Sequence, residues 1–197
     1  MKNRDAPLRP PMLLAIAYAP ASVRARLKWL LSLDERLLAI LERTSEPMIA
    51  QLRLSWWRDA MNAESDKRPK GEPLFAALGE IEPDAAVIDA SLALIDAFEI
   101  LAIDADVKAQ SLARMQRVTA ICDAYAIWAG CGQSHRAQID QVACWWGNLA
   151  KPIPKSLPRL LRPISIMALA EHLETSAAEP RLFRNGVRLN WHALTGR

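Results

Sequence analysis

The chain has little glycine, and it has neither a long apolar run nor a cysteine framework. Only 7 glycines accompany abundant alanine, leucine, arginine and glutamate, which favours helices joined by short loops over strands and tight turns. No apolar run approaches the roughly 18 residues that a membrane-spanning helix needs, so we predict no transmembrane segment. Residues 1–5 are mostly polar and carry no recognisable signal peptide. We therefore expect an all-α protein in the cytoplasm.

Cysteine and histidine are too few and too scattered for a metal site or a disulfide framework. Cys122, Cys131 and Cys144 are odd in number and lack Cys-x-x-Cys spacing, so we interpret them as core thiols. The three histidines stand far apart and form no His-x-x-x-His or Glu-x-x-His pattern. We predict that the residues of this chain form no metal site.

The net charge of +3 conceals an uneven distribution of charged residues. Residues 1–30 hold six basic and one acidic side chain, and residues 151–197 hold eight and three, whereas the middle of the chain is acidic. Basic ends can favour anionic membranes or nucleic acid, but these residues are scattered singly and no nucleic-acid motif accompanies them. We interpret them as a solvated surface and predict no nucleic-acid partner.

At 197 residues, with 51% hydrophobic and 24% charged residues, the chain has the size and composition of one globular domain, residues 1–197. Residues 1–11 contain three prolines and predict an extended or partly disordered arm. Residues 64–73 lack apolar side chains and predict an exposed loop. Apolar periodicity and capping signals predict helices over 22–44, 74–80, 84–102, 107–130, 136–150, 164–173 and 187–194. The residues expected on buried faces are Leu27, Leu30, Leu37, Leu41, Leu52, Trp56, Met115, Tyr125 and Trp146.

The segment Ser45–Asn62 combines a helix-start signal with an arginine–tryptophan cluster. Ser45 is a candidate cap, and Pro47 costs little in a first helical turn, where amides lack intrahelical partners. Residues 48 or 49, 52, 56 and 60 recur at helical spacing, so we predict that this stripe faces the core. A second face, with Arg53 four residues before Trp57, either lines a binding site or is covered by neighbouring helices with its arginines reaching the solvent.

Short blocks across most of the chain resemble the squalene/phytoene synthase superfamily, in particular its divergent short proteobacterial members. The strongest is a leucine-rich block at 33–37 followed by Gln51-Leu52-Arg53-Leu54-Ser55-Trp56-Trp57-Arg58, which is similar to the family's first two helices. Residues 125–130 are similar to its tyrosine-to-alanine-glycine helix, and residues 157–163 to a late leucine-proline segment. The resemblance implies an all-α, isoprenoid-synthase-like helical bundle around a central cavity.

The resemblance also implies a reaction, because active family members condense two prenyl diphosphates with magnesium held by two aspartate-rich motifs. Magnesium requires oxygen ligands. The first motif position reads Leu38-Ala39-Ile40-Leu41-Glu42, and the second, within residues 143–152, keeps only Asn148 as a match. The remaining carboxylates are Asp34, Glu35 and Glu42 on one predicted helix and Asp140 on another, and they do not form two clusters. Magnesium is therefore expected only if the chain is an active transferase.

Three functions remain open. The first is a catalytically degenerate member that acts as a binding or assembly factor, since mitochondrial relatives without the aspartates assist assembly of respiratory complex I, a membrane complex. The second is a head-to-head prenyl-diphosphate transferase, and the third is an isoprenoid or lipid carrier. We favour the first, with no catalytic residues, with an isoprenoid, a lipid or a membrane-bound protein as partner, and with peripheral association with the inner membrane left open. The pocket residues implied by the matching blocks are Arg53, Trp57, Arg58, Tyr125, Trp128 and Asn148.

Overall fold

The computed structural model describes residues 8–81, 83–103, 106–147, 157–176 and 182–195, and within these ranges the protein is helical with no β-strand. The all-α prediction is confirmed. The α-helices are α1 (Pro10–Tyr18), α2 (Ala21–Arg43), α3 (Pro47–Asn62), α4 (Pro73–Glu80), α5 (Ala85–Ala102), α6 (Val107–Trp128), α7 (Arg136–Gly147), α8 (Arg162–Ser176) and α9 (Leu182–Thr195).

Side-chain caps mark the starts of α4, α5 and α6. The Asp84 carboxylate accepts a hydrogen bond from the amide of Val87 at 3.0 Å, and Asp106 caps α6 in the same way through the amide of Ala109 at 2.8 Å. Gly130, just past α6, adopts a φ of 67°, a left-handed conformation that favours glycine. Helices α1, α2 and α3 start without a side-chain capping bond, and the N-cap residue of α3 is Glu46 rather than Ser45.

Helix α1 was not predicted from the sequence. The proline-rich segment 1–11 was expected to be extended, but Pro10 and Pro11 open α1, whose Met12 and Ala15 are completely buried. Prolines are tolerated there because first-turn amides have no intrahelical acceptor, and their fixed φ suits a helix. Residues 1–7 lie outside the described part of the chain.

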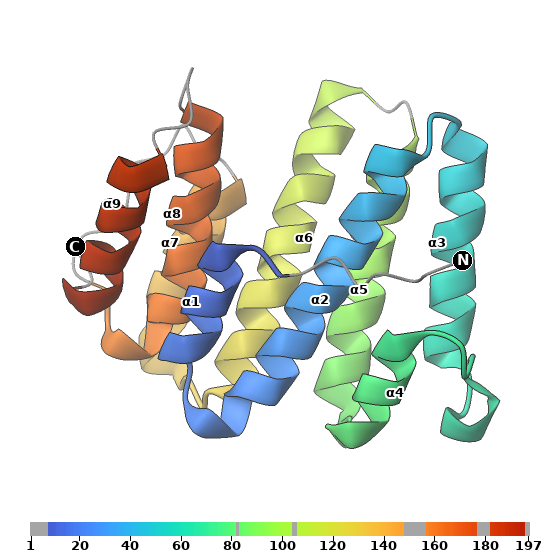
Figure 1. Ribbon diagram of the computed structural model, residues 1–197, viewed down its shortest axis with the longest axis horizontal. Coiled ribbons are helices and arrows are strands. Elements are labelled where there is room, and N and C mark those ends of the chain that lie inside the picture. The colour runs from blue at the N-terminus through green and yellow to red at the C-terminus, as the bar shows by residue number, and fades with distance from the viewer. Residues whose placement is uncertain (1–7, 82, 104–105, 148–156, 177–181, 196–197) are drawn as a thin grey trace.

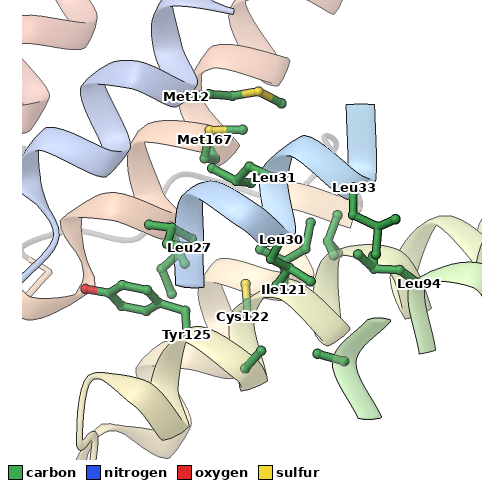
Figure 2. Close-up of a cluster of buried hydrophobic side chains, with 14 of the residues drawn as sticks. Met12, Leu27, Leu30, Leu31, Leu33, Leu94, Ile121, Cys122, Tyr125 and Met167 are labelled. Atoms are coloured by element: carbon green, nitrogen blue, oxygen red, sulfur yellow. The ribbon is translucent and has the colours of Figure 1, made fainter. Parts of the chain in front are cut away.

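The helices pack as a bundle with α2, α5 and α6 at its centre (Figure 1). Helix α3 packs on α5 at one end of the long axis, while α7, α8 and α9 follow one another at the other end, with α1 against α8. Figure 2 shows side chains of α1, α2, α5, α6 and α8 converging on this interior. Leu30 and Leu33 of α2 lie near Ile121 of α6 and Leu94 of α5, and all four are completely buried.

Most of the predicted core residues are buried. Leu27, Leu30, Leu37, Tyr125 and Trp146 are completely or almost completely buried, whereas Leu41 and Met115 are only partly buried. Leu52 and Trp56, in contrast, are exposed. No helix in the described ranges has both the length and the apolar character needed to cross a membrane.

Candidate functional site

Helix α3 turns a different face to the core from the one that the sequence predicted. Its buried residues are Ala50, Leu54, Trp57, Ala60 and Met61. Most of the predicted core stripe is instead exposed to solvent: Met48, Ile49, Leu52 and Trp56 are exposed, and of its predicted members only Ala60 is buried. The prediction was wrong for Leu52 and Trp56 because α3 carries two apolar stripes, both at helical spacing, and periodicity alone does not say which one packs inward.

This exposed stripe, Met48, Ile49, Leu52 and Trp56, is the outer face of α3. Met48 and Leu52 are 79% and 73% exposed, which is unusual for large apolar side chains spaced along one helix face. The stripe runs along one side of a groove of about 410 Å³ between α2 and α3. The groove is lined by Arg36, Ile40, Leu52, Arg53, Trp56, Trp57 and Glu72.

Aromatic rings form one wall of this groove. The rings of Trp56 and Trp57 meet edge to face at 5.3 Å, and Phe75 of α4 lies 5.1 Å from Trp57 and 6.1 Å from Trp56. Such pairs add packing energy beyond the area that they bury. The wall is therefore held in place by the core side of α3 and by α4.

The two arginines of the groove differ in their partners. Arg36 of α2 forms an ion pair with Glu72 at 2.9 Å, and the same carboxylate accepts a hydrogen bond from the amide of Leu74 at the start of α4. Arg53 of α3 donates to the hydroxyl of Thr44 at 3.1 Å, and among the described residues it has no carboxylate partner. The guanidinium of Arg53 is thus the cation at this groove that is available to an incoming anion.

The six predicted pocket residues do not gather around one cavity. Arg53 and Trp57 line the groove, but Arg58 points to α5, where it pairs with Asp96 and lies 2.7 Å from Glu99. Arg53 and Arg58 are five residues apart, which is about 140° around an α-helix of 3.6 residues per turn, so their side chains point in different directions.

Tyr125 and Trp128 lie on α6, away from the groove. The Tyr125 hydroxyl donates to the Leu160 carbonyl at 2.6 Å, and burial raises the pKa of this phenol. The indole nitrogen of Trp128 is buried without an acceptor among the described residues. Asn148 lies outside the described part of the chain.

A charged cluster lies in the interior of the bundle. The guanidinium of Arg117 on α6 donates two hydrogen bonds of 2.7 Å to Asp34 on α2, and Asp34 is completely buried. Burial alone would lower the pKa of Arg117, but the carboxylate of Asp34, with smaller contributions from Glu171 and Glu35, raises it. Arg117 also lies 5.6 Å from the centre of the Phe98 ring and 3.9 Å from Glu171, whose carboxylate accepts from the indole of Trp146.

Sequence reasoning named Asp34 only as a leftover carboxylate and did not single out Arg117. A signal was present, because Arg117 stands four residues after Ala113 and four before Ile121, on the stripe that α6 buries. A cation on a buried stripe requires a partner, so it points to a buried carboxylate elsewhere in the chain.

Three of the four carboxylates near the positions where the resemblance implies aspartate motifs are paired with arginines. Asp34 binds Arg117, Glu35 binds Arg9 at 2.9 Å, and Asp140 binds Arg136 at 2.8 Å, while Glu42 is exposed and has no arginine partner among the described residues. No group of three or more potential metal ligands occurs in the ranges that the structure describes. These residues do not fit the oxygen-rich cluster that magnesium requires.

A second hollow, of about 630 Å³, lies between α5 and α6. Its lining includes the carboxylates of Asp96 and Asp123, which pair with Arg58 and Arg136 respectively. The carboxylates of this hollow are therefore already neutralised by arginines, which makes the α2–α3 groove the stronger candidate for a binding site.

No protein-family model, curated protein or solved structure matches this chain.

Proposed function

We propose that the protein is a binding or assembly factor, a catalytically degenerate relative of the squalene/phytoene synthases with an isoprenoid-synthase-like bundle. Its binding surface is the outer face of α3 together with the α2–α3 groove. The observation that carries the proposal is the exposure of Met48, Ile49, Leu52 and Trp56 on a helix whose opposite face is fixed in the core.

The size of this surface suits a binding site. From their exposed fractions, the four side chains present roughly 500 Å² to solvent, which is in the range of the largest patch on a typical monomer, a patch that is often functional. The surface is also preorganised, because Leu54, Trp57 and Met61 anchor α3 to the core. A partner that binds here does not have to order the helix, and this saves part of the entropic cost of association.

The occupant that fits best is an amphipathic helix of a partner protein. A shallow groove between two helices, bordered by a stripe at positions i, i+4 and i+8, matches the helix-in-groove mode of recognition. Arg53 stands at this groove without a carboxylate in the described part of the chain, so the partner helix should carry an acidic residue opposite it.

The ion pairs that hold the interior carboxylates support a binding function over prenyl transfer. With Asp34 and Glu35 held by arginines, the residues that remain would have to bind a diphosphate without a cluster of metal ligands. A carboxylate that balances the charge of a buried arginine is not available to ligate a metal ion unless the pair is broken at a cost of several kcal/mol.

A small amphipathic anion is the second candidate ligand. The groove volume of about 410 Å³ falls in the range of small-molecule sites, and arginine beside indole suits a phosphate or diphosphate with an apolar tail. The groove is open along its length, however, whereas carrier sites enclose most of the ligand surface. This comparison favours the protein partner.

Photocrosslinking tests the proposal in cells that express the protein. A benzophenone amino acid replaces Leu52 on the outer face of α3 and, as a matched control, the exposed Leu112 on α6. An acidic partner helix crosslinked from position 52 and absent from position 112 is the expected result. The corresponding purified peptide should then lose affinity with Leu52→Glu and with Arg53→Glu, and a basic residue in place of its acid should rescue Arg53→Glu.

A thermal-shift screen separates the other candidates. Farnesyl diphosphate, a polyprenol and an anionic lipid are added with and without magnesium, since a ligand that binds only the folded state raises the melting temperature. A shift with farnesyl diphosphate that Arg53→Gln abolishes, together with no crosslinked helix at position 52, would replace the protein partner by the amphipathic anion.

A further inference from the structure

Helix α9 has one face bound to the bundle and one face turned away from it. His192 and Ala193 are buried, and the imidazole of His192 is hydrogen-bonded to the hydroxyl of Ser165 on α8 at 2.9 Å. On the opposite side Val187, Trp191 and Leu194 are exposed, and Trp191 and Leu194 are 62% and 63% exposed. Their spacing of four and three residues places them in one stripe along the helix.

The charge of α9 has a single sign. The helix contains two arginines and no acidic residue, and Arg188, next to Val187 in the stripe, is exposed. Residues 151–197 together hold eight basic and three acidic side chains. An apolar stripe that contains tryptophan and is flanked by arginine is the pattern of helices that lie in a membrane interface.

We propose that α9 is a docking helix for the surface of an anionic membrane. Val187, Trp191 and Leu194 enter the boundary between headgroups and acyl chains, and Arg188 meets lipid phosphates. With 14 residues the helix is too short to span a bilayer, so it lies parallel to the surface.

A membrane fits this face better than a protein partner does. The three side chains expose roughly 350 Å², well below the roughly 800 Å² that each partner buries in a standard protein interface. The face is the convex side of a single helix, and none of these side chains lines a described pocket. Interfacial binding needs no minimum area or hollow, because it scales with the apolar surface inserted and with the attraction of anionic lipid.

This surface is separate from the α2–α3 groove. Helices α9 and α3 lie at opposite ends of the long axis of the molecule (Figure 1). A protein that rests on a membrane through α9 therefore keeps the outer face of α3 open to a partner. The inference does not rest on the proposed function of the groove.

Vesicle sedimentation tests the proposal on the full chain. Vesicles of phosphatidylglycerol and phosphatidylcholine are compared with vesicles of phosphatidylcholine alone, at low and at high salt. The wild-type protein should sediment with the anionic vesicles and dissociate from them as salt rises. The double variant Trp191→Gln, Leu194→Gln should bind at least about tenfold more weakly, whereas Leu112→Gln, an exposed leucine on α6, should bind as the wild type does.

A second readout locates Trp191 itself. Vesicles with brominated acyl chains should quench part of the wild-type tryptophan fluorescence, and Trp191→Phe, which stays apolar, should still bind but lose that quenching. The proposal is overturned if the wild type stays in the supernatant at low salt, if neutral vesicles bind it as tightly as anionic ones, or if the double variant binds unchanged. Loss of a protein partner in the double variant, with vesicle binding intact, would likewise assign the face to a protein.

Discussion

The buried pair of Asp34 and Arg117 offers the sharpest test of the interior. Arg117→Met keeps most of the side-chain volume but leaves the completely buried Asp34 carboxylate without its two 2.7 Å hydrogen bonds. Removing one partner of a buried ion pair typically destabilises by about 3–5 kcal/mol, because the remaining charge is uncompensated. For a chain of this size the melting temperature should fall by roughly 6–20 °C.

The double variant Asp34→Leu, Arg117→Met distinguishes the net contribution of the ion pair from the cost of leaving one charge unpaired. It removes both charges and fills their space with apolar atoms, so its free energy of unfolding should lie within about 1 kcal/mol of the wild type or above it. Urea denaturation followed by far-ultraviolet circular dichroism measures all variants. Glu42→Gln, on the exposed face of α2, is the control for loss of one carboxylate and should be nearly neutral.

Unfolding of Arg117→Met at the same urea concentration as the wild type would show that the buried Asp34 carboxylate does not depend on this arginine. A double variant no more stable than the sum of the two single variants predicts would show that the two charges are not coupled.

Three further predictions follow from the described residues. Trp57→Ala should lower the free energy of unfolding by roughly 3–5 kcal/mol, and Trp56→Ala by about 1 kcal/mol or less, in urea titrations. Burial raises the pKa of Glu35 above 4.5 despite the opposing effect of Arg9. The folded state therefore binds the proton of Glu35 more tightly than the unfolded state does, and the free energy of unfolding falls as pH rises from 4.5 through the folded-state pKa. Glu35→Gln should remove this component from a series of melts against pH. Incubation with labelled farnesyl diphosphate and magnesium should give condensation at least roughly three orders of magnitude slower than in an active synthase.

Each of these has an outcome that contradicts it. Equal costs for the two tryptophan variants would mean that α3 is rotated relative to the structure described above. A wild type and a Glu35→Gln variant with the same dependence of stability on pH would place Glu35 in solvent. Magnesium-dependent squalene or phytoene formation at ordinary enzyme rates would restore the transferase hypothesis.

Helix positions were predictable where a local signal coincides with a boundary. Asp84 and Asp106 cap α5 and α6 through side-chain hydrogen bonds, and Pro47 and Pro73 open α3 and α4. These signals act within one turn, so they can be recognised from neighbouring residues alone. The start of α1 was missed because consecutive prolines were interpreted as an extended segment, although they are equally compatible with a first helical turn.

The orientation of α3 was not predictable in the same way. Leu52 and Trp56 form as regular a stripe as Leu54 and Trp57, and the choice between them depends on Phe75 of α4 and on contacts with α5, which are distant in sequence. The placement of Arg53 at the groove and of Arg58 at α5 follows from the same rotation. A sequence pattern fixes the angle between two stripes, and only the neighbouring helices decide which one is buried.

The interior ion pair bears on where a ligand can bind. A carboxylate balanced by a guanidinium of its own chain has no charge left to recruit an exchangeable cation, and Phe98 and Glu171 also contact Arg117. Admitting a ligand at this point would separate Asp34 from Arg117 and leave two buried charges unpaired, at a cost that few ligand contacts offset. At the α2–α3 groove, by contrast, Arg53 is solvated and a binding partner has no ion pair to break. The difference in desolvation cost between these two arginines therefore favours binding on the outer face of α3 over binding in the interior.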